Sequence, residues 1–386
     1  MKKTYEEIND RIAKGEAVVV TAEEIISMVD EMGIKETAKK VDVVTTGTFG
    51  PMCSSGAFLN FGHSDPPIKM NRIWLNGVPA SGGLAAVDTY IGATEECELN
   101  GMQYGGAHVI EDLVAGKKVQ LKAYGKRTDC YPNKQVEGLI GLESLNEAFL
   151  FNPRNAYQNY AAATNSSDRT LYTYMGVLLP RFGNVNYSTS GQLSPLLNDP
   201  EFRSIGIGTP IFIGGTRGYV AWWGTQHKTQ AEKGPNGVPV GPGGTLSLIG
   251  DLKEMSTEYL KAAVFEKYGI SLFVGVGIPI PVLDEDMVKF TSVRDRDIFT
   301  WVIDYSVPGR DRPKLAKLSY EELKSGEAAI NGGRVPTASL SSMYKARQIA
   351  EELKQWIKSG RFLLNPPLQH LPQGKSVNPL TFMEEE

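Results

Sequence analysis

Residues 17–46 contain the pattern that most constrains the fold: two β-branched apolar segments separated by a helical one. The apolar segments are AVVVT at 17–21 and VDVVTT at 41–46. Between them, Thr21-Ala-Glu-Glu24 matches a capping box, which predicts a helix that begins there and stops at Gly33. A strand, a helix and a strand at this spacing are typical of a βαβ unit. The chain should therefore contain a sheet with helices packed on it.

Segments elsewhere in the chain extend this prediction to a mixed α/β fold. They predict a helix from Thr4 to near Gly15, a strand, turn and strand within 204–227, a helix over 256–269, a buried strand over 270–283, and a helical stripe from Leu340 to Ile357. The pair formed by 256–269 and 270–283 is interpreted as a second βα-type unit. We predict an α/β fold with mixed sheets, flanking helices and long Gly/Pro-rich loops at the active site.

Glycine and proline mark the loops in the middle of the chain. Turn dipeptides interrupt 71–88, and EKGPNGVPVGPGG at 232–244 is too rich in Gly and Pro for regular structure. Long loops in a compact domain are usually lids or binding loops. Since no linker divides the chain cleanly, we predict one catalytic region over 1–386, which two α/β lobes without an evident boundary could form. Residues 373–386 are predicted to be a flexible tail.

The charge and the apolar runs narrow the range of partners. The formal net charge is −4, which argues against nucleic acid and against a polybasic membrane anchor. The longest apolar run, at 270–283, contains two prolines and is too short to span a bilayer. The N-terminus has no signal-peptide core and the C-terminus no lipidation motif. We therefore expect a cytoplasmic protein, and a homo-oligomer is compatible with the sequence.

No motif for NAD, flavin or PLP is present. Gly206-x-Gly208 and Gly275-x-Gly277 suggest a dinucleotide fingerprint but lack its third glycine, and a proline follows each of them closely. No phosphate-binding loop and no Gly-x-Ser-x-Gly elbow occur. The four histidines stand far apart without ligand spacing. The remaining candidate chemistry is that of thiols.

Cys53 is the principal candidate, in the segment TFGPMCSSGAF that follows a predicted strand. If a helix begins just after it, the helix end favours a thiolate, which can be a nucleophile, a persulfide carrier or a metal ligand. Ser54 and Ser55 could donate to sulfur or to an oxyanion. His63 could act as an acid or base, or could only cap the loop.

Cys130 and Cys97 complete the set of three cysteines. Cys130 has basic neighbours in GKRTDCYPN, which favour a thiolate, whereas the acids around Cys97 in GATEECELNG disfavour one. Together with Cys53 they could hold three irons of a [4Fe-4S] cluster and leave the fourth iron open for sulfide. Alternatively, only one or two of these thiols matter.

Four segments resemble the homocysteine biosynthesis family, which consists of archaeal and anaerobic-bacterial L-aspartate semialdehyde sulfurtransferases. They are VDVVTTGTFGPMCSSGAFLNFGH, PPIKMNRIWLNGVPA, VDTYIGATE and RTDCYP, and the similarity extends from about residue 5 to 370. The resemblance implies an enzyme that forms homocysteine, with functional cysteines that match Cys53 and Cys130. It also implies a ferredoxin-like electron donor. Some members carry a C-terminal pair of CBS domains, for which this chain ends too soon.

The implied chemistry is the addition of sulfide to an aldehyde, followed by a two-electron reduction. Cys53 would carry the sulfur as a persulfide or sulfide adduct, and Cys130 would resolve the persulfide or bind a cluster. Arg181 and Arg217 are candidates for the substrate carboxylate, since a guanidinium fits that group.

Two hypotheses from other classes stay open. The first is an iron–sulfur or sulfur-carrier module that delivers sulfur to a partner without turnover of its own. The second is a structural role for all three thiols, against which the glycine-rich loop around Cys53 argues.

Overall fold

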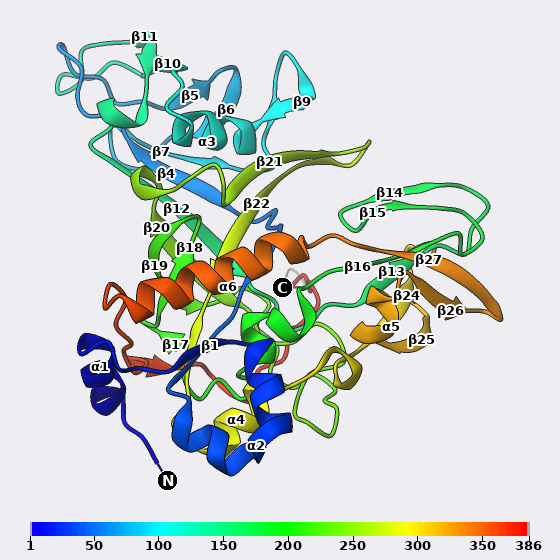
Figure 1. The fold of residues 1–386 in the computed structure, drawn as a ribbon. Helices are drawn as coiled ribbons and strands as arrows, with labels where there is room; N and C mark the ends of the chain where they lie inside the picture. Colours follow the sequence, from blue (N-terminus) through cyan, green and yellow to red (C-terminus); the bar gives the residue numbers. More distant parts are fainter. Residues whose placement is uncertain (1, 384–386) are drawn as a thin grey trace.

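Three larger sheets organise residues 2–383, the part of the chain that the computed structural model describes (Figure 1). The smallest of them contains the predicted βαβ unit. Its strands are β1 (Val19–Thr21), β2 (Val43–Thr45) and β23 (Pro279–Pro281), and β1 pairs parallel with β2. The helix α2 (Glu24–Lys40) connects β1 to β2.

The start of α2 confirms the predicted capping interaction, but its predicted end is wrong. The Glu24 amide donates to Thr21 Oγ1 over 3.2 Å, and the Thr21 amide donates to the Glu24 carboxylate over 2.7 Å. Gly33 has φ +77° and interrupts the helix as expected, yet a second helical segment continues to Lys40. A glycine in the left-handed region allows this kink, because it has no Cβ to clash with the backbone.

A 13-stranded sheet with only antiparallel pairs forms the body of the molecule. In spatial order it runs β11 (Gln135–Ile140), β10 (Val119–Tyr124), β5 (Arg72–Leu75), β6 (Val78–Ser81), β7 (Asp88–Gly92), β4 (Gly56–Asn60), β12 (Glu147–Asn155), β20 (Leu246–Asp251), β19 (Thr216–Trp223), β18 (Pro210–Ile213), β22 (Gly269–Gly277) and β21 (Leu260–Phe265), with β3 (Thr48–Pro51) also paired to β22.

The predicted helix over 256–269 is wrong, because this segment contains the strand β21. Leu260 pairs with Val274 and Phe265 with Gly269, so β21 and β22 form a hairpin. Helix propensity is a weak preference that tertiary context overrides, and here the apolar strand β22 pairs with β21. The predicted second βα-type unit is therefore absent, whereas the buried strand predicted within 270–283 is confirmed.

A six-stranded mixed sheet lies beside the long sheet, at the right of Figure 1. Its order is β25 (Lys314–Ser319), β24 (Phe299–Asp304), β13 (Ala162–Thr164), β16 (Val185–Tyr187), β27 (Gly333–Ser339) and β26 (Glu327–Ile330). The pairs β13–β24 and β16–β27 are parallel. Mixed sheets and flanking helices confirm the predicted α/β class. The division of the chain into two lobes stays a prediction.

The other elements are short, apart from the long helix α6. They are α1 (Tyr5–Ala13), α3 (Gly106–Val114), α4 (Glu285–Thr291), α5 (Tyr320–Lys324) and α6 (Met343–Lys358), the strand pairs β8 (Glu96–Cys97) with β9 (Gly101–Gly105), β14 (Leu171–Thr173) with β15 (Gly176–Leu178) and β17 (Gly206–Ile207) with β28 (Gln369–His370), and the 3₁₀ turns Leu142–Ser144, Gly191–Leu193, Pro195–Leu197, Leu252–Glu254 and Asp295–Asp297. Residues 373–383 contain no helix or strand, and 384–386 lie outside the described residues. The flexibility of this tail stays a prediction.

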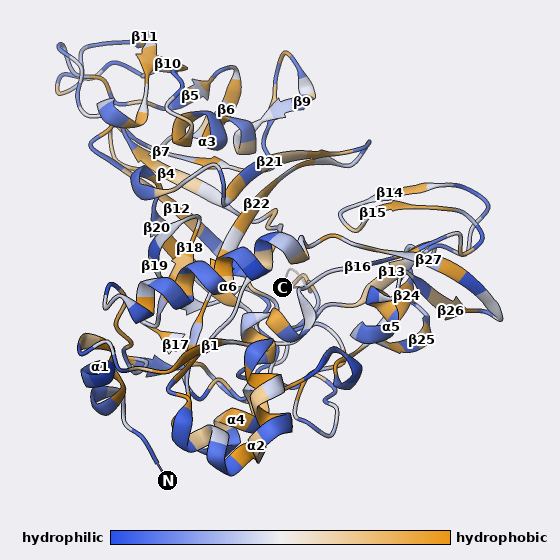
Figure 2. Cartoon of the chain, viewed as in Figure 1, coloured by the Kyte–Doolittle hydropathy of each residue, from blue (hydrophilic) through white to orange (hydrophobic). Residues whose placement is uncertain are grey.

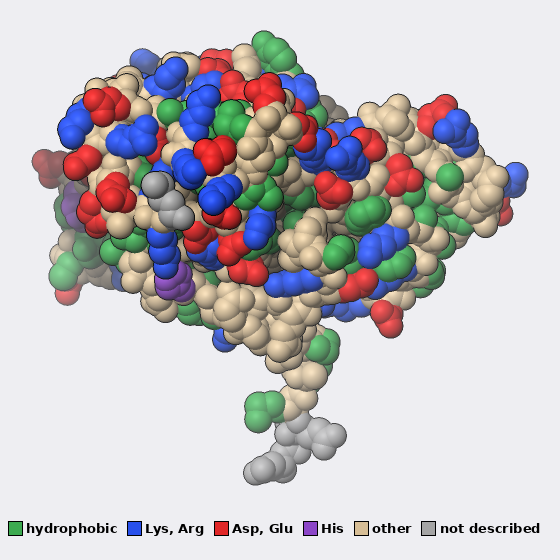
Figure 3. Space-filling model, turned by 60° about the horizontal axis from the view of Figure 1, so that its bottom comes forward, with side chains coloured by type: hydrophobic (Ala, Val, Ile, Leu, Met, Phe, Trp, Pro, Cys, Tyr) green, Lys and Arg blue, Asp and Glu red, His purple; other side chains and the backbone are tan. Residues whose placement is uncertain are grey.

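Hydrophobic residues concentrate on the strands of the long sheet and on one face of α6 (Figure 2). The predicted stripe of α6 is confirmed, since it buries Ala346, Ile349, Ala350, Leu353, Trp356 and Ile357. A separate buried cluster that includes Val185, Val302 and Tyr320 forms the hydrophobic core of the six-stranded sheet. On the face in Figure 3, Lys and Arg lie among Asp and Glu rather than in one patch. Within residues 2–383, no helix is both long and apolar enough to cross a membrane.

Replacement of Gly47 by Ala should destabilise the fold by about 1–3 kcal/mol, the usual cost of overpacking. Gly47 lies between β2 and β3, and a Cβ there would overlap the Ala346 carbonyl oxygen of α6. Chemical denaturation should show a lower midpoint for Gly47→Ala. Gly138→Ala is the matched control, because open space surrounds a Cβ at that strand position. Equal midpoints for both variants would contradict this close packing of α6.

Candidate active site

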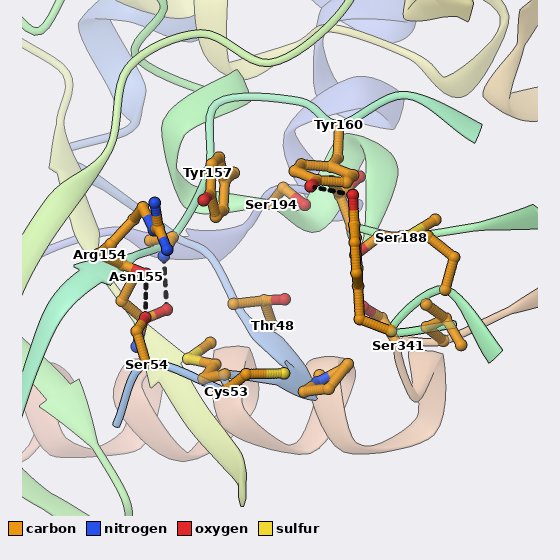
Figure 4. Close-up of a pocket in the computed structure, with 18 of the residues that line it drawn as sticks. Thr48, Cys53, Ser54, Arg154, Asn155, Tyr157, Tyr160, Ser188, Ser194 and Ser341 are labelled. Carbon is orange, nitrogen blue, oxygen red and sulfur yellow. Dashed lines mark hydrogen bonds between the residues drawn. The ribbon is translucent and has the colours of Figure 1, made fainter. Parts of the chain in front are cut away.

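A cavity of about 400 Å³ lies where the long sheet meets the six-stranded sheet (Figure 4). Its walls come from the segments 48–54, 154–160, 174–175, 188–196 and 340–341, together with Gln226 and Tyr268. The Gly/Pro-rich loop 232–244, predicted as a binding loop, contributes no residue to these walls. Among the lining residues that the structure describes, Cys53 is the single cysteine, Arg154 is the single cation, and none is a carboxylate.

The turn between β3 and β4 places Cys53 in the cavity. The Met52 amide donates to the Leu272 carbonyl over 2.8 Å. Within the turn, the Ser55 amide donates to the Met52 carbonyl over 3.0 Å. The Cys53 Sγ lies 3.1 Å from Ser271 Oγ on β22. The strand β4 begins at Gly56, so no helix begins just after Cys53 and no positive helix end lies at the sulfur.

Burial dominates the electrostatics of this thiol. It raises the pKa of Cys53, and the hydrogen bond with Ser271 and the positive charge of Arg154 only partly oppose this. The condition for a thiolate stabilised by a helix end is therefore not met, because the chain continues as a strand and desolvation disfavours the anion. At neutral pH the resting residue is a thiol, and Ser271 is placed to donate to the thiolate once it forms.

The raised pKa predicts the pH dependence of alkylation. At pH 7.5, iodoacetamide should modify the exposed Cys130 before the mostly buried Cys53. Because the thiolate fraction of Cys53 appears only at higher pH, its rate should still increase above about pH 9. Peptide mass spectrometry of timed samples measures both rates. A Cys53 rate that is already constant below about pH 8 would contradict the buried, protonated thiol.

The two serines after Cys53 serve the turn itself. Ser54 Oγ donates to Asn152 Oδ1 over 3.0 Å and to the Arg154 carbonyl over 2.9 Å. Ser55 is buried, and its Oγ accepts from Asn152 Nδ2 over 2.8 Å. Ser54 lines the cavity and Ser55 does not. Both serines therefore fasten the cysteine turn to β12 and fix the backbone that carries Arg154.

Four other residues predicted for the site lie outside the cavity. Cys130 is exposed in the loop between β10 and β11, and His63 stacks on Tyr131 at a centroid distance of 6.1 Å. Arg181 pairs with Asp168 over 2.6 Å, with both side chains largely exposed. Arg217 lies over the Phe362 ring and donates to the Arg361 carbonyl. None of these four lines the cavity, so the carboxylate site predicted at Arg181 or Arg217 is not formed there.

Arg154 is the cation that the sequence interpretation missed. It lies near the end of β12, where the pairing with β20 shifts register between Asn152 and Asn155. A β-bulge of this kind redirects side chains beside active sites. The signal that could have found it is its position three residues after the end of the apolar run 148–151. Figure 4 shows Arg154 above Ser54, on the same side of the cavity as Cys53.

Four tyrosines, Tyr157, Tyr160, Tyr174 and Tyr268, also line the cavity. Tyr160 Oη donates to Tyr174 Oη over 3.2 Å, and Tyr174 shares a 2.8 Å hydrogen bond with Tyr305 Oη. Tyr157 packs edge-on against Tyr160 at 5.0 Å. Burial raises the pKa of Tyr157, Tyr160 and Tyr305. These phenols therefore stay protonated, and that of Tyr157, which lines the cavity, can donate to an oxygen that becomes negative during a reaction.

The cysteines do not fit a shared [4Fe-4S] cluster. Cys97 is buried on β8, with Sγ 3.6 Å from the Asn76 carbonyl, far along the chain from the cavity turn. Within residues 2–383, no group of three His, Cys, Asp or Glu side chains could hold a metal ion. A cluster needs several thiolates at one place. The predicted ligand set of Cys53, Cys97 and Cys130 is therefore not assembled in this conformation.

The comparisons with known proteins agree on one family. A family model described as "Homocysteine biosynthesis enzyme, sulfur-incorporation" matches residues 17–364. An L-aspartate semialdehyde sulfurtransferase of Methanosarcina acetivorans is 53% identical over 98% of this chain and 73% of its own length. A protein of the same name from Methanocaldococcus jannaschii is 53% identical over 99% of this chain and 76% of its own length. No solved structure matches the chain.

Proposed function

The chain belongs to the family of homocysteine biosynthesis enzymes that incorporate sulfur, and on this premise we propose that its cavity converts L-aspartate semialdehyde and sulfide to L-homocysteine. The observation that carries the assignment of the site is the combination of one thiol and one cation in a cavity without a carboxylate. A thiol can add to an aldehyde, and a cation without an acidic partner can bind a carboxylate.

Arg154 would bind the substrate carboxylate and fix the position of the aldehyde. Its guanidinium offers a planar pair of donors to that group. The hydroxyl oxygens of Thr48, Ser188 and Ser341, which line the cavity, can accept from the substrate ammonium. The phenol of Tyr157, which lines the cavity, would donate to the aldehyde oxygen as it gains negative charge.

Cys53 would act as the covalent nucleophile. Its thiolate sulfur bonds to the aldehyde carbon, and the oxygen takes up a proton to give a thiohemiacetal. Loss of water and addition of hydrosulfide place a second sulfur on that carbon. Departure of the Cys53 sulfur then leaves a thioaldehyde and regenerates the thiol. Two electrons and two protons reduce the thioaldehyde to homocysteine, so one aldehyde and one hydrogen sulfide give one thiol and one water.

This route is preferred to a persulfide because it needs no second thiol. A persulfide on Cys53 would have to be resolved by another cysteine, and neither Cys97 nor Cys130 lines the cavity. The electrons are assigned to an external donor in the cytoplasm, for which a ferredoxin-like protein is the proposed class. The roles of Cys130 and of a cluster remain as secondary proposals, to be tested by iron and labile-sulfide assays on anaerobically purified protein.

The test is an anaerobic assay of the full chain with L-aspartate semialdehyde, isotopically labelled sulfide and titanium(III) citrate as the reductant. Mass spectrometry should find homocysteine that carries the labelled sulfur, and omission of any one component should abolish it. Labelled sulfur that binds to the protein but never appears in homocysteine would overturn the proposal. That result would favour the sulfur-carrier hypothesis instead.

A further inference from the structure

A second cleft, here called the outer cleft, adjoins the active-site cavity. It measures about 430 Å³ and is more open to solvent. Tyr174 and Tyr268 belong to the walls of both spaces. These two tyrosines therefore form the boundary between the solvent-facing cleft and the cavity that contains Cys53.

Positive charge collects in the outer cleft. Arg169, Lys267 and Arg312 line it, and none of the described lining residues is an Asp or Glu. Asp168, the acid next to Arg169 in the chain, pairs with Arg181. The whole chain carries a formal net charge of −4. The outer cleft is therefore positive on a protein that is negative overall, since its three cations have no acidic partner among the lining residues. Such a concave positive region attracts anions.

The neighbouring aromatic rings hold two of these cations in place. The Arg312 guanidinium lies 4.3 Å from the Tyr305 ring centroid, and its Nε donates to the Val307 carbonyl over 3.3 Å. Lys267, at the tip of the β21–β22 hairpin, donates to Tyr172 Oη on β14 over 3.2 Å. Stacking on a ring leaves the outer N–H groups of a guanidinium free for a ligand. The two charges are therefore positioned before an anion arrives.

We propose that the outer cleft is a second anion-binding site, which receives hydrosulfide, the anionic reactant, before it passes Tyr174 and Tyr268 to the cavity of Cys53. The class of ligand is a small monoanion, and its identity as hydrosulfide rests on the proposed function. The semialdehyde carries both a carboxylate and an ammonium, so it has no net charge and gains no such attraction. A positively charged cleft at the entrance increases the association rate of an anion with a protein whose net charge is negative. The chain Tyr305–Tyr174–Tyr160 connects the two sites through the hydrogen bonds described above.

The kinetic test removes the three charges together. The variant Arg169→Gln/Lys267→Gln/Arg312→Gln should lose about tenfold in kcat/KM for sulfide at low ionic strength, measured at saturating semialdehyde, with kcat unchanged. Raising the salt from about 20 to 300 mM should reduce kcat/KM of the wild type toward that of the variant, because salt screens the attraction. The matched control is Lys14→Gln/Lys118→Gln/Lys358→Gln, which removes the same charge from exposed positions elsewhere. Equal losses in both triple variants would overturn the proposal.

A binding test separates this proposal from the proposed function. Equilibrium dialysis with radioactive sulfate would be done on Arg154→Gln, so that the inner cation does not contribute. One sulfate should bind, and the three outer-cleft substitutions added to Arg154→Gln should abolish its binding. Persistent binding after these substitutions would overturn the outer site even if homocysteine is formed. If no homocysteine is formed but sulfate binding follows this pattern, the proposed function fails while the anion site stands.

Discussion

Cys53→Ser should reduce homocysteine formation by at least about three orders of magnitude. A serine hydroxyl is a far weaker nucleophile than a thiolate near neutral pH, because its proton is held much more strongly. Loss of a nucleophile that forms a covalent intermediate typically costs this much or more in kcat. The single thiol of the cavity would be lost, and no other cysteine in the described walls could replace it. The measurement is the labelled-sulfide assay under saturating substrate.

The other two cysteines are the matched controls for this variant. Cys130 is exposed and Cys97 is buried away from the cavity, so Cys130→Ser and Cys97→Ser should each retain activity within about threefold of the wild type. A loss in Cys130→Ser as large as that in Cys53→Ser would show that the two thiols act together. It would then require a conformation in which the loop between β10 and β11 reaches the cavity. Full activity of Cys53→Ser would remove the nucleophilic role altogether.

The fold was predictable where a segment's own sequence determines its structure. The βαβ unit at 17–46 and the amphipathic helix α6 were predicted because capping residues and apolar periodicity are local signals. The strand β21 was missed, because its structure depends on pairing with β22, which the sequence of β21 alone does not reveal. The order of the 13-stranded sheet could not be predicted for the same reason: strands such as β4 and β12 pair across a long separation in the chain.

The site was predictable at the thiol but not at its partners. Cys53 stands out because small residues surround it, and these allow the sharp turn between β3 and β4. Arg154 does not stand out, because an arginine beside prolines and asparagines is most often on the surface. Its place in the cavity wall beside a register shift of β12 is a feature of the folded sheet that the sequence does not reveal. Arg217 was a candidate because a guanidinium fits a carboxylate, but its side chain lies over the Phe362 ring instead.

Since Arg154 lines the cavity and Arg217 does not, the two arginines should differ in their effect on substrate binding. Arg154→Gln should lower kcat/KM for the semialdehyde by about 10²-fold, mostly through KM. A charge-assisted hydrogen bond to a carboxylate contributes about 1.5–3 kcal/mol, and each 1.4 kcal/mol corresponds to about tenfold in binding. Glutamine keeps a donor and much of the side-chain volume, so the cavity should retain its shape. Initial rates over a range of semialdehyde concentrations, at fixed saturating sulfide and reductant, give both parameters.

Arg217→Gln is the control, because it removes the same charge from a position outside the cavity. It should leave kcat/KM within about twofold of the wild type. A further comparison uses 3-aminopropanal, which lacks the substrate carboxylate. If Arg154 binds that carboxylate, wild type and Arg154→Gln should process this aldehyde equally slowly, because the interaction that distinguishes them is absent. A difference between the two proteins that persists with 3-aminopropanal would mean that Arg154 acts on the aldehyde or on the Cys53 sulfur rather than on the carboxylate.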